Sequence, residues 1–152
     1  MVVPQYLLFF ISFIVLVADQ LSKFFIHRSL YFGQSIPIVK NIFHFSLVHN
    51  SGIAFGLFKN QTIFFIILSI IVIIYILSDS IFHLKQYTLK KHIALGLILG
   101  GALGNLLDRI RLGCVVDFLD FRVWPVFNIA DSSITIGMVL LGWSLLREPK
   151  RT

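Results

Sequence analysis

Four long apolar runs, separated by more polar connections, dominate the pattern of the chain. A helix needs about 20 mostly apolar residues to cross the hydrocarbon core of a bilayer. The first run is uncharged through Ala18, and the second is almost wholly aliphatic or aromatic from Ile63 to Leu77. We therefore predict four membrane-spanning helices in one domain that covers residues 1–152. Their expected ranges are about 3–25, 62–82, 92–111 and 131–147.

The connection between the first two runs, residues 27–61, has a different period. Apolar and polar residues alternate in Ile42–His49, as in a strand with one apolar face. Asn50-Ser51-Gly52 then predicts a turn, and the apolar stretch Ile53–Phe58 is too short to span a membrane. We expect an all-α integral membrane protein, a four-helix bundle with a small extracytoplasmic β-sheet on the membrane surface.

The composition supports the membrane assignment. Hydrophobic residues make up 57% of the chain and charged residues 13%, with a mean hydropathy of +0.90. Soluble domains average about 25% charged residues, so a globule of this size would leave large apolar patches in water. This excludes a soluble domain and a disordered chain. The single cysteine, Cys114, excludes an internal disulfide.

We attribute the net charge of +6 to basic residues that flank the spans and set the membrane topology, and not to nucleic-acid binding. The short connection 83–91 carries Lys85, Lys90 and Lys91, whereas the much longer segment 27–61 carries only three basic residues. Basic residues concentrate in cytoplasmic loops. We expect both termini and the 83–91 connection on the cytoplasmic side, which agrees with an even number of spans.

Small residues recur in the third span, where Gly96, Gly100 and Gly104 lie four residues apart. This spacing permits close contact between helices in lipid. The contact could lie within one chain or between two chains.

Acidic residues gather at one predicted side of the membrane. Four of them fall at the outer ends of spans or just beyond: Asp19, Asp108, Asp117 and Asp131. Asp120 lies in the same outer connection, and Asp79 lies at the opposite end, where we expect a solvated helix terminus. Ionisable groups at membrane depth are costly and usually mark a site.

Two readings of these carboxylates stay open at this point. Two adjacent carboxyl groups can share one proton and hydrolyse a peptide through an activated water. They could instead be helix caps and ion-pair partners, since Asp131-Ser132-Ser133 is a good helix start and Asp19 and Lys23 are spaced for a helical ion pair. The spacing alone does not select which acids pair.

Two functions other than hydrolysis are compatible with these acids. A small transporter or channel subunit would use the acids as a proton or cation relay, and a non-catalytic assembly factor would not depend on them. The chain has neither a zinc-type H-E-x-x-H motif nor a G-x-S-x-G motif, and its five histidines are scattered. We expect no cofactor and no metal.

Read as a whole, the chain resembles the signal peptidase II family, the bacterial lipoprotein signal peptidases. The resemblance lies in five blocks that occur in the order of the family. These are Asp19-x-x-x-Lys23, Asn50-x-Gly52-x-Ala54-Phe55, Gly104-Asn105-x-x-Asp108-Arg109, Val115-Val116-Asp117-Phe118 and Phe127-Asn128-x-Ala130-Asp131.

The resemblance implies a four-span aspartyl protease of the bacterial cytoplasmic membrane with its active site toward the outer face. Such enzymes cleave diacylglyceryl-modified prolipoproteins just before the lipidated cysteine, so the implied partners are this substrate and membrane lipids, with no obligate protein partner. Asp117 and Asp131 match the catalytic dyad. The matched positions that would bind substrate or support the site are Asn50, Gly52, Asn105, Asp108, Arg109, Asn128, Asp19 and Lys23.

Overall fold

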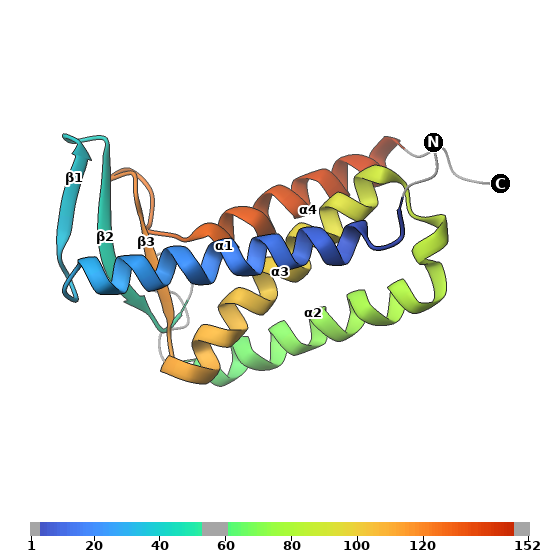
Figure 1. Cartoon of the computed structure of the whole chain (residues 1–152), viewed down its shortest axis with the longest axis horizontal. Helices are drawn as coiled ribbons and strands as arrows, with labels where there is room; N and C mark the ends of the chain where they lie inside the picture. Colours follow the sequence, from blue (N-terminus) through green and yellow to red (C-terminus); the bar gives the residue numbers. More distant parts are fainter. Residues whose placement is uncertain (1–3, 53–60, 148–152) are drawn as a thin grey trace.

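A computed structural model describes residues 4–52 and 61–147 of the chain. Four long helices lie along one another, with a small sheet across one end (Figure 1). The helices are α1 (Leu7–Ser29), α2 (Thr62–His83), α3 (Leu89–Leu112) and α4 (Ile129–Arg147), and the 3₁₀ helix η2 (Leu84–Gln86) follows α2. All four are long and apolar enough to cross a membrane, which confirms the predicted fold class. The apolar stretch Ile53–Phe58, with the motif residues Ala54 and Phe55, lies outside the described residues.

Capping explains where the helix bounds differ from the apolar runs. α3 begins three residues before the predicted start because the Thr88 side chain accepts a hydrogen bond from the Lys91 amide at 3.3 Å. It ends at Gly113, which adopts the left-handed conformation with φ of 73°. α1 continues past the predicted Phe25 to Ser29. The polar first and last turns of these helices extend beyond the hydrophobic pattern used to predict them.

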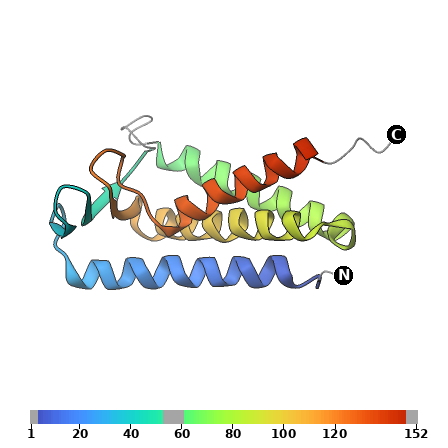
Figure 2. The same ribbon diagram turned by 90° about the horizontal axis from the view of Figure 1, so that it is seen from above.

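α3 is the central helix of the bundle. It packs against α1, α2 and α4, and its apolar window is 61% buried, against 17–28% for the other three helices. Figure 2 shows α1 and α4 alongside α3 in a second view. Among the described residues, α2 packs closely on α3 but on neither α1 nor α4. The polar residues of α3 are therefore the ones that several helices can reach.

Glycines make the central contacts close. A Cβ on Gly96 or Gly100 would lie 2.8 or 2.6 Å from the backbone oxygens of Leu8 and Ser12 in α1. On another side of α3, a Cβ on Gly101 would lie 2.5 Å from a backbone oxygen of α4. The predicted glycine stripe thus packs within one chain.

The sheet crosses the ends of the helices, at what we call the sheet end of the bundle. Its strands are β1 (Ser35–Val39), β2 (Phe43–Asn50) and β3 (Val115–Asp120), antiparallel and in the order β1-β2-β3. The expectation that the sheet lies within residues 27–61 covers β1 and β2 but misses β3, which comes from the connection between α3 and α4. β3 is buried on both faces, so its sequence shows no alternation that would identify a strand.

At the opposite end of the bundle, Asp79 is not the solvated terminus we expected. Its carboxylate accepts hydrogen bonds from the Tyr87 hydroxyl at 2.6 Å and from Lys91 Nζ at 3.1 Å. His83 Nδ1 lies 2.9 Å from the other carboxylate oxygen. Asp79 therefore joins the end of α2 to the start of α3, a role that spacing within α2 could not predict.

We expect Gly100→Ala to destabilise the protein by about 1–3 kcal/mol, because its Cβ would overlap the α1 backbone. Gly142→Ala is the matched control, since a Cβ at Gly142 in α4 meets nothing within 4 Å. The control should gain up to about 1 kcal/mol from better helix propensity. Unfolding of both variants in the same detergent measures the difference. An unchanged Gly100→Ala variant would mean that α1 does not approach α3 this closely.

Candidate active site

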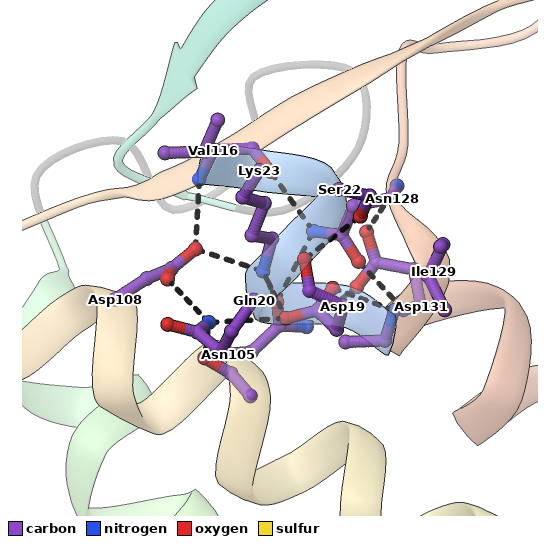
Figure 3. Close-up of polar contacts among 12 residues, drawn as sticks. Asp19, Gln20, Ser22, Lys23, Asn105, Asp108, Val116, Asn128, Ile129 and Asp131 are labelled. Atoms are coloured by element: carbon purple, nitrogen blue, oxygen red, sulfur yellow. Dashed lines mark hydrogen bonds and ion pairs between the residues drawn. The ribbon is translucent and has the colours of Figure 1, made fainter. Parts of the chain in front are cut away.

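The four acids that the sequence places at outer ends of spans do converge beside the sheet, although Asp19 lies midway along α1 and not at its end. Asp19 comes from α1, Asp108 from α3, Asp117 from β3 and Asp131 from α4. Each of the four is linked by hydrogen bonds or an ion pair to others of the set through shared partners, as Figure 3 shows for three of them. The carboxylates fall into two groups, one around Lys23 and one around Asn128.

Lys23 is the centre of the first group. Its Nζ lies 2.7 Å from Asp19 Oδ2 and 2.8 Å from Asp108 Oδ2, with all three side chains at most 5% exposed. The ion pair expected between Asp19 and Lys23 is confirmed, and Asp108 extends it to a second helix. Asp19 Oδ1 also accepts a hydrogen bond from the Ala130 amide at 3.0 Å, and Asp108 Oδ2 accepts one from the Val116 amide at 3.1 Å. This charge cluster therefore joins α1, α3, α4 and β3.

Gln20 belongs to the same cluster, and the sequence reasoning missed it. Its Nε2 lies 3.2 Å from Asp19 Oδ2, 3.3 Å from the Gly104 carbonyl and 2.9 Å from Asp108 Oδ1. The signal that could have found it is a polar residue beside Asp19 in an otherwise apolar span.

Asn128 holds the second group together. Its Nδ2 donates to Asp117 Oδ1 at 2.7 Å, and its Oδ1 accepts from the Asp131 amide at 2.8 Å. The backbone N–H of Asn128 in turn donates to Asp131 Oδ2 at 3.3 Å. This exchange is a capping box, since Asn128 directly precedes α4 and Asp131 lies three residues later. Asp131 is thus both a helix-start residue and a neighbour of Asp117, so the two readings of this acid are compatible.

Two further amides complete the support of the carboxylates. Asn105 Nδ2 donates to Asp131 Oδ1 at 2.7 Å, and Asn50 Nδ2 donates to Asp117 Oδ2 at 2.9 Å. Asn105 Oδ1 accepts from Asn128 Nδ2 at 3.1 Å and from Lys23 Nζ at 3.2 Å. Both oxygens of both carboxylates are therefore held by donors, and Asn105 connects them to the charge cluster.

Local backbone structure positions these side chains. Phe127 pairs with Leu119 of β3 through backbone hydrogen bonds of 2.8 and 3.1 Å, which returns the chain so that Asn128 lies beside Asp117. The Gly52 amide donates to Asn50 Oδ1 at 3.0 Å. That bond orients the Asn50 amide so that its Nδ2 faces Asp117.

The Asp117 side chain is 1% exposed, and its environment disfavours ionisation. Burial first, and then the nearby Asp131 carboxylate, raise the pKa of Asp117 from 3.8 to about 7. The hydrogen bonds from Asn50 and Asn128 oppose this shift. Asp117 is therefore partly protonated near neutral pH.

A cleft of about 710 Å³ opens beside the two carboxylates. Arg109 lies in its wall with Asp117 and Asp131, and its guanidinium carbon is 5.2 Å from the centre of the Phe65 ring of α2. Most of the remaining wall is apolar. The full lining is Asn50, Gly52, Arg109, Val115, Asp117, Phe121, Trp124, Pro125, Val126, Phe127, Asp131, Ser132, Thr135 and Ile136.

Asp120 is separate from this arrangement. It lies three residues after Asp117 on β3, where alternation turns its side chain to the other face. Its carboxylate accepts from Ser46 Oγ at 2.7 Å and from Arg122 at 3.0 Å. Asp120 is therefore a natural control for changes at Asp117.

Taken together, the spanning helices and the buried carboxylates beside a largely apolar cleft define an integral membrane protein with a polar site at one end of its bundle. A sequence profile described as Signal peptidase (SPase) II matches residues 11–147. The chain belongs to the signal peptidase II family, and is thus related to peptidases. This confirms the resemblance carried by the five motif blocks.

Individual relatives can be aligned with this chain over nearly their whole length. A lipoprotein signal peptidase of Moorella thermoacetica is 46% identical over 136 residues, which cover 90% of each chain. One from Halothermothrix orenii is 43% identical over 145 residues, covering 95% of this chain and 98% of the relative. A bacterial membrane enzyme solved by the in meso method at 2.3 Å resolution has a TM-score of 0.85 and 34% identity, covering 95% of this chain and 93% of that one.

Lys23→Met should destabilise the protein by about 3–5 kcal/mol, because it leaves two buried carboxylates without their cation. Lys91→Met is the matched control: that lysine is 33% exposed and pairs with Asp79 at the opposite end. The control should cost no more than about 1 kcal/mol. The free energy of unfolding of each variant in detergent tests this, and equal losses would contradict a structural role specific to Lys23.

The raised pKa of Asp117 makes stability depend on pH. Between about pH 4 and 7 the folded state holds a proton that the unfolded state has lost, so this group's stabilisation is complete below pH 3.8 and is lost as pH rises through about 7. In the Asp117→Asn variant this loss of stability with rising pH should disappear. The free energy of unfolding of the variant, relative to wild type, should rise by at most about 4 kcal/mol from pH 4 to pH 8.

The amide side chain introduced by Asp117→Asn also makes different hydrogen bonds, and their effect on the free energy of unfolding is the same at every pH. The informative measurement is therefore how the difference in free energy of unfolding between Asp117→Asn and wild type changes with pH, and not the size of that difference at one pH. Asp120→Asn is the control. A difference between wild type and Asp117→Asn that does not vary with pH would show that Asp117 titrates normally.

Proposed function

We propose that this protein is an aspartyl endopeptidase that removes signal peptides from diacylglyceryl-modified prolipoproteins, cutting just before the lipidated cysteine. The observation that carries the proposal is the pair Asp117 and Asp131, which lie in the wall of the cleft and are bridged by the buried Asn128. The substrate class is supported by the relatives, which bear the name lipoprotein signal peptidase. The catalytic unit is a single membrane-embedded domain over residues 1–152.

The chemistry uses one proton shared by the two carboxyl groups. The ionised carboxylate takes a proton from water as the water oxygen attacks the peptide carbonyl carbon, and the protonated carboxyl gives its proton to the carbonyl oxygen. The resulting diol then collapses. One carboxyl protonates the leaving nitrogen while the other accepts a proton from the diol, the C–N bond breaks, and the dyad again holds one proton.

The surrounding amides give this reaction a fixed geometry. Asn50, Asn105 and Asn128 hold the oxygens of the dyad, so neither carboxylate has to reorient during the reaction. Arg109 presents a cation at the cleft wall, where it would bind the carbonyl oxygens of the substrate backbone. Asp19, Lys23 and Asp108 support the dyad indirectly. Lys23 holds Asn105, and Asp19 holds the start of α4.

The cleft suits a substrate that arrives from the bilayer. Four lining residues, Asp131, Ser132, Thr135 and Ile136, follow one face of α4 away from the dyad. Ile136 is 53% exposed, and so is accessible to lipid. Phe121 and Trp124 add exposed aromatic surface at the sheet end. A signal helix would lie along α4, with the acyl chains against the apolar wall.

Lysines at the end opposite the sheet support the orientation. Lys85, Lys90 and Lys91 lie in or beside the α2–α3 connection. The positive-inside rule places that end in the cytoplasm, together with both termini, and so puts the dyad at the outer face of the bacterial cytoplasmic membrane.

The distribution of acids favours a protease over a transporter. A proton or cation relay needs acidic groups at intermediate depth. In the described part of the chain, Asp108 and Asp131 lie near the sheet end and Asp79 lies near the opposite end. Asp19 lies midway along α1, but its carboxylate is held in a buried ion pair with Lys23.

The test is cleavage of a lipidated precursor by purified protein in detergent, followed by the mobility of the product on a gel. Asp117→Asn and Asp131→Asn should each reduce the rate by at least about 10³-fold, since either change removes the shared-proton chemistry. Asp120→Asn should cleave at the wild-type rate. EDTA should leave the wild-type rate unchanged.

Two results would refute the proposal. The first is normal cleavage by a folded Asp117→Asn or Asp131→Asn variant. The second is loss of wild-type activity on chelation while the protein stays folded, together with recovery when a divalent metal is added, which would assign the chemistry to a metal.

A further inference from the structure

Two histidine side chains meet outside the candidate active site, where α1 ends beside β2. His27 lies in the last turn of α1 and His49 lies near the end of β2, and their Nε2 atoms are 3.3 Å apart. Both residues are exposed. The function proposed above uses neither of them, so this pair needs a separate explanation.

The separation of the two nitrogens fits a shared metal ion. Two nitrogens that each lie about 2.0–2.1 Å from one tetrahedral Zn²⁺ are themselves about 3.3 Å apart. In the metal-free protein the two ring nitrogens share a hydrogen bond at this distance, and a bound ion would replace its proton. Imidazole is also a preferred ligand of zinc, copper and nickel.

The pair is held in place by its surroundings. The Phe32 ring packs against His49, with ring centres 4.9 Å apart, and the two imidazole centres are 5.3 Å apart. Leu30 and Leu47 lie in one buried apolar cluster that fixes the end of α1 to the sheet. An ion would therefore find its two protein ligands already close together.

We propose that His27 and His49 form a binding site for one transition-metal ion of the Zn²⁺ class, with water in the remaining positions. The described residues contain no group of three or more His, Cys, Asp and Glu suited to a metal, so solvent must complete the coordination. The bound ion ties α1, which carries Asp19 and Lys23, to β2, which carries Asn50.

The site is distinct from the proposed dyad. His49 and Asn50 are adjacent in β2, so their side chains point to opposite faces of the strand. Only Asn50 reaches Asp117. The ion stabilises the fold and takes no part in peptide cleavage, so this inference can fail while the proposed function holds, and the reverse.

The experiment titrates tag-free, metal-stripped protein in detergent with Zn²⁺ by calorimetry, and with Co²⁺ by visible absorption. We expect one ion per chain and a tetrahedral Co²⁺ spectrum. His27→Gln and His49→Gln should each weaken binding at least about tenfold, and Zn²⁺ should raise the Tm of the wild type but not of these variants. His83→Gln, which removes an exposed histidine beside Asp79 at the opposite end, is the matched control and should bind as wild type.

A rescue separates lost ligation from lost structure. His27→Cys restores a zinc ligand at the same position and should recover most of the Zn²⁺ affinity that His27→Gln loses. The proposal is overturned if the wild type binds no Zn²⁺, if the double variant His27→Gln, His49→Gln binds as well as wild type, or if only His83→Gln loses binding.

Discussion

One buried cation holds the sheet end of this protein together. Lys23 lies between Asp19 and Asp108, with all three side chains nearly inaccessible to water. Charges buried in this way are stable only when each one has its partners, so the positions of the helices that supply them are strongly constrained. Through backbone amides, the same two carboxylates also fix the start of α4 and the strand β3. The candidate dyad depends on this cluster, since Asn105 accepts from Lys23 and donates to Asp131.

The charge cluster requires close packing of the helices. A Cβ on Gly104 would lie 2.6 Å from Asp19 Oδ2, so any larger residue would occupy the space of the carboxylate. Gly96 and Gly100 bring α1 equally close to α3 along the preceding turns. The small residues of α3 and the polar site therefore depend on each other. The glycines allow α1 and α3 to lie close together, and the ion pairs of Lys23 form across that short distance.

Sequence reasoning found the features that depend on local pattern. Apolar runs identified the spans, alternation identified β2, and the positions of acids relative to span ends identified their convergence. It missed features that depend on distant partners. β3 has no periodic signature because both of its faces are covered, Gln20 is recognisable only once α3 lies beside α1, and Asp79 finds its partners across the α2–α3 connection. The motif blocks named Asp117, Asp131 and Asn128 as parts of one site, and the fold added which atoms of Asn128 join the two acids.

The hydrogen bond between Asp19 and the Ala130 amide joins residues 111 positions apart in the chain. It therefore has a consequence for the order of events during synthesis. The first helix can enter the membrane early, but its carboxylate meets this partner only when the fourth helix has been made and inserted. Until then Asp131 has no fixed position, and a partly synthesised chain lacks the pair formed by Asp117 and Asp131. The protein thus acquires its proposed hydrolytic activity only after α4 has been inserted beside α1 and α3.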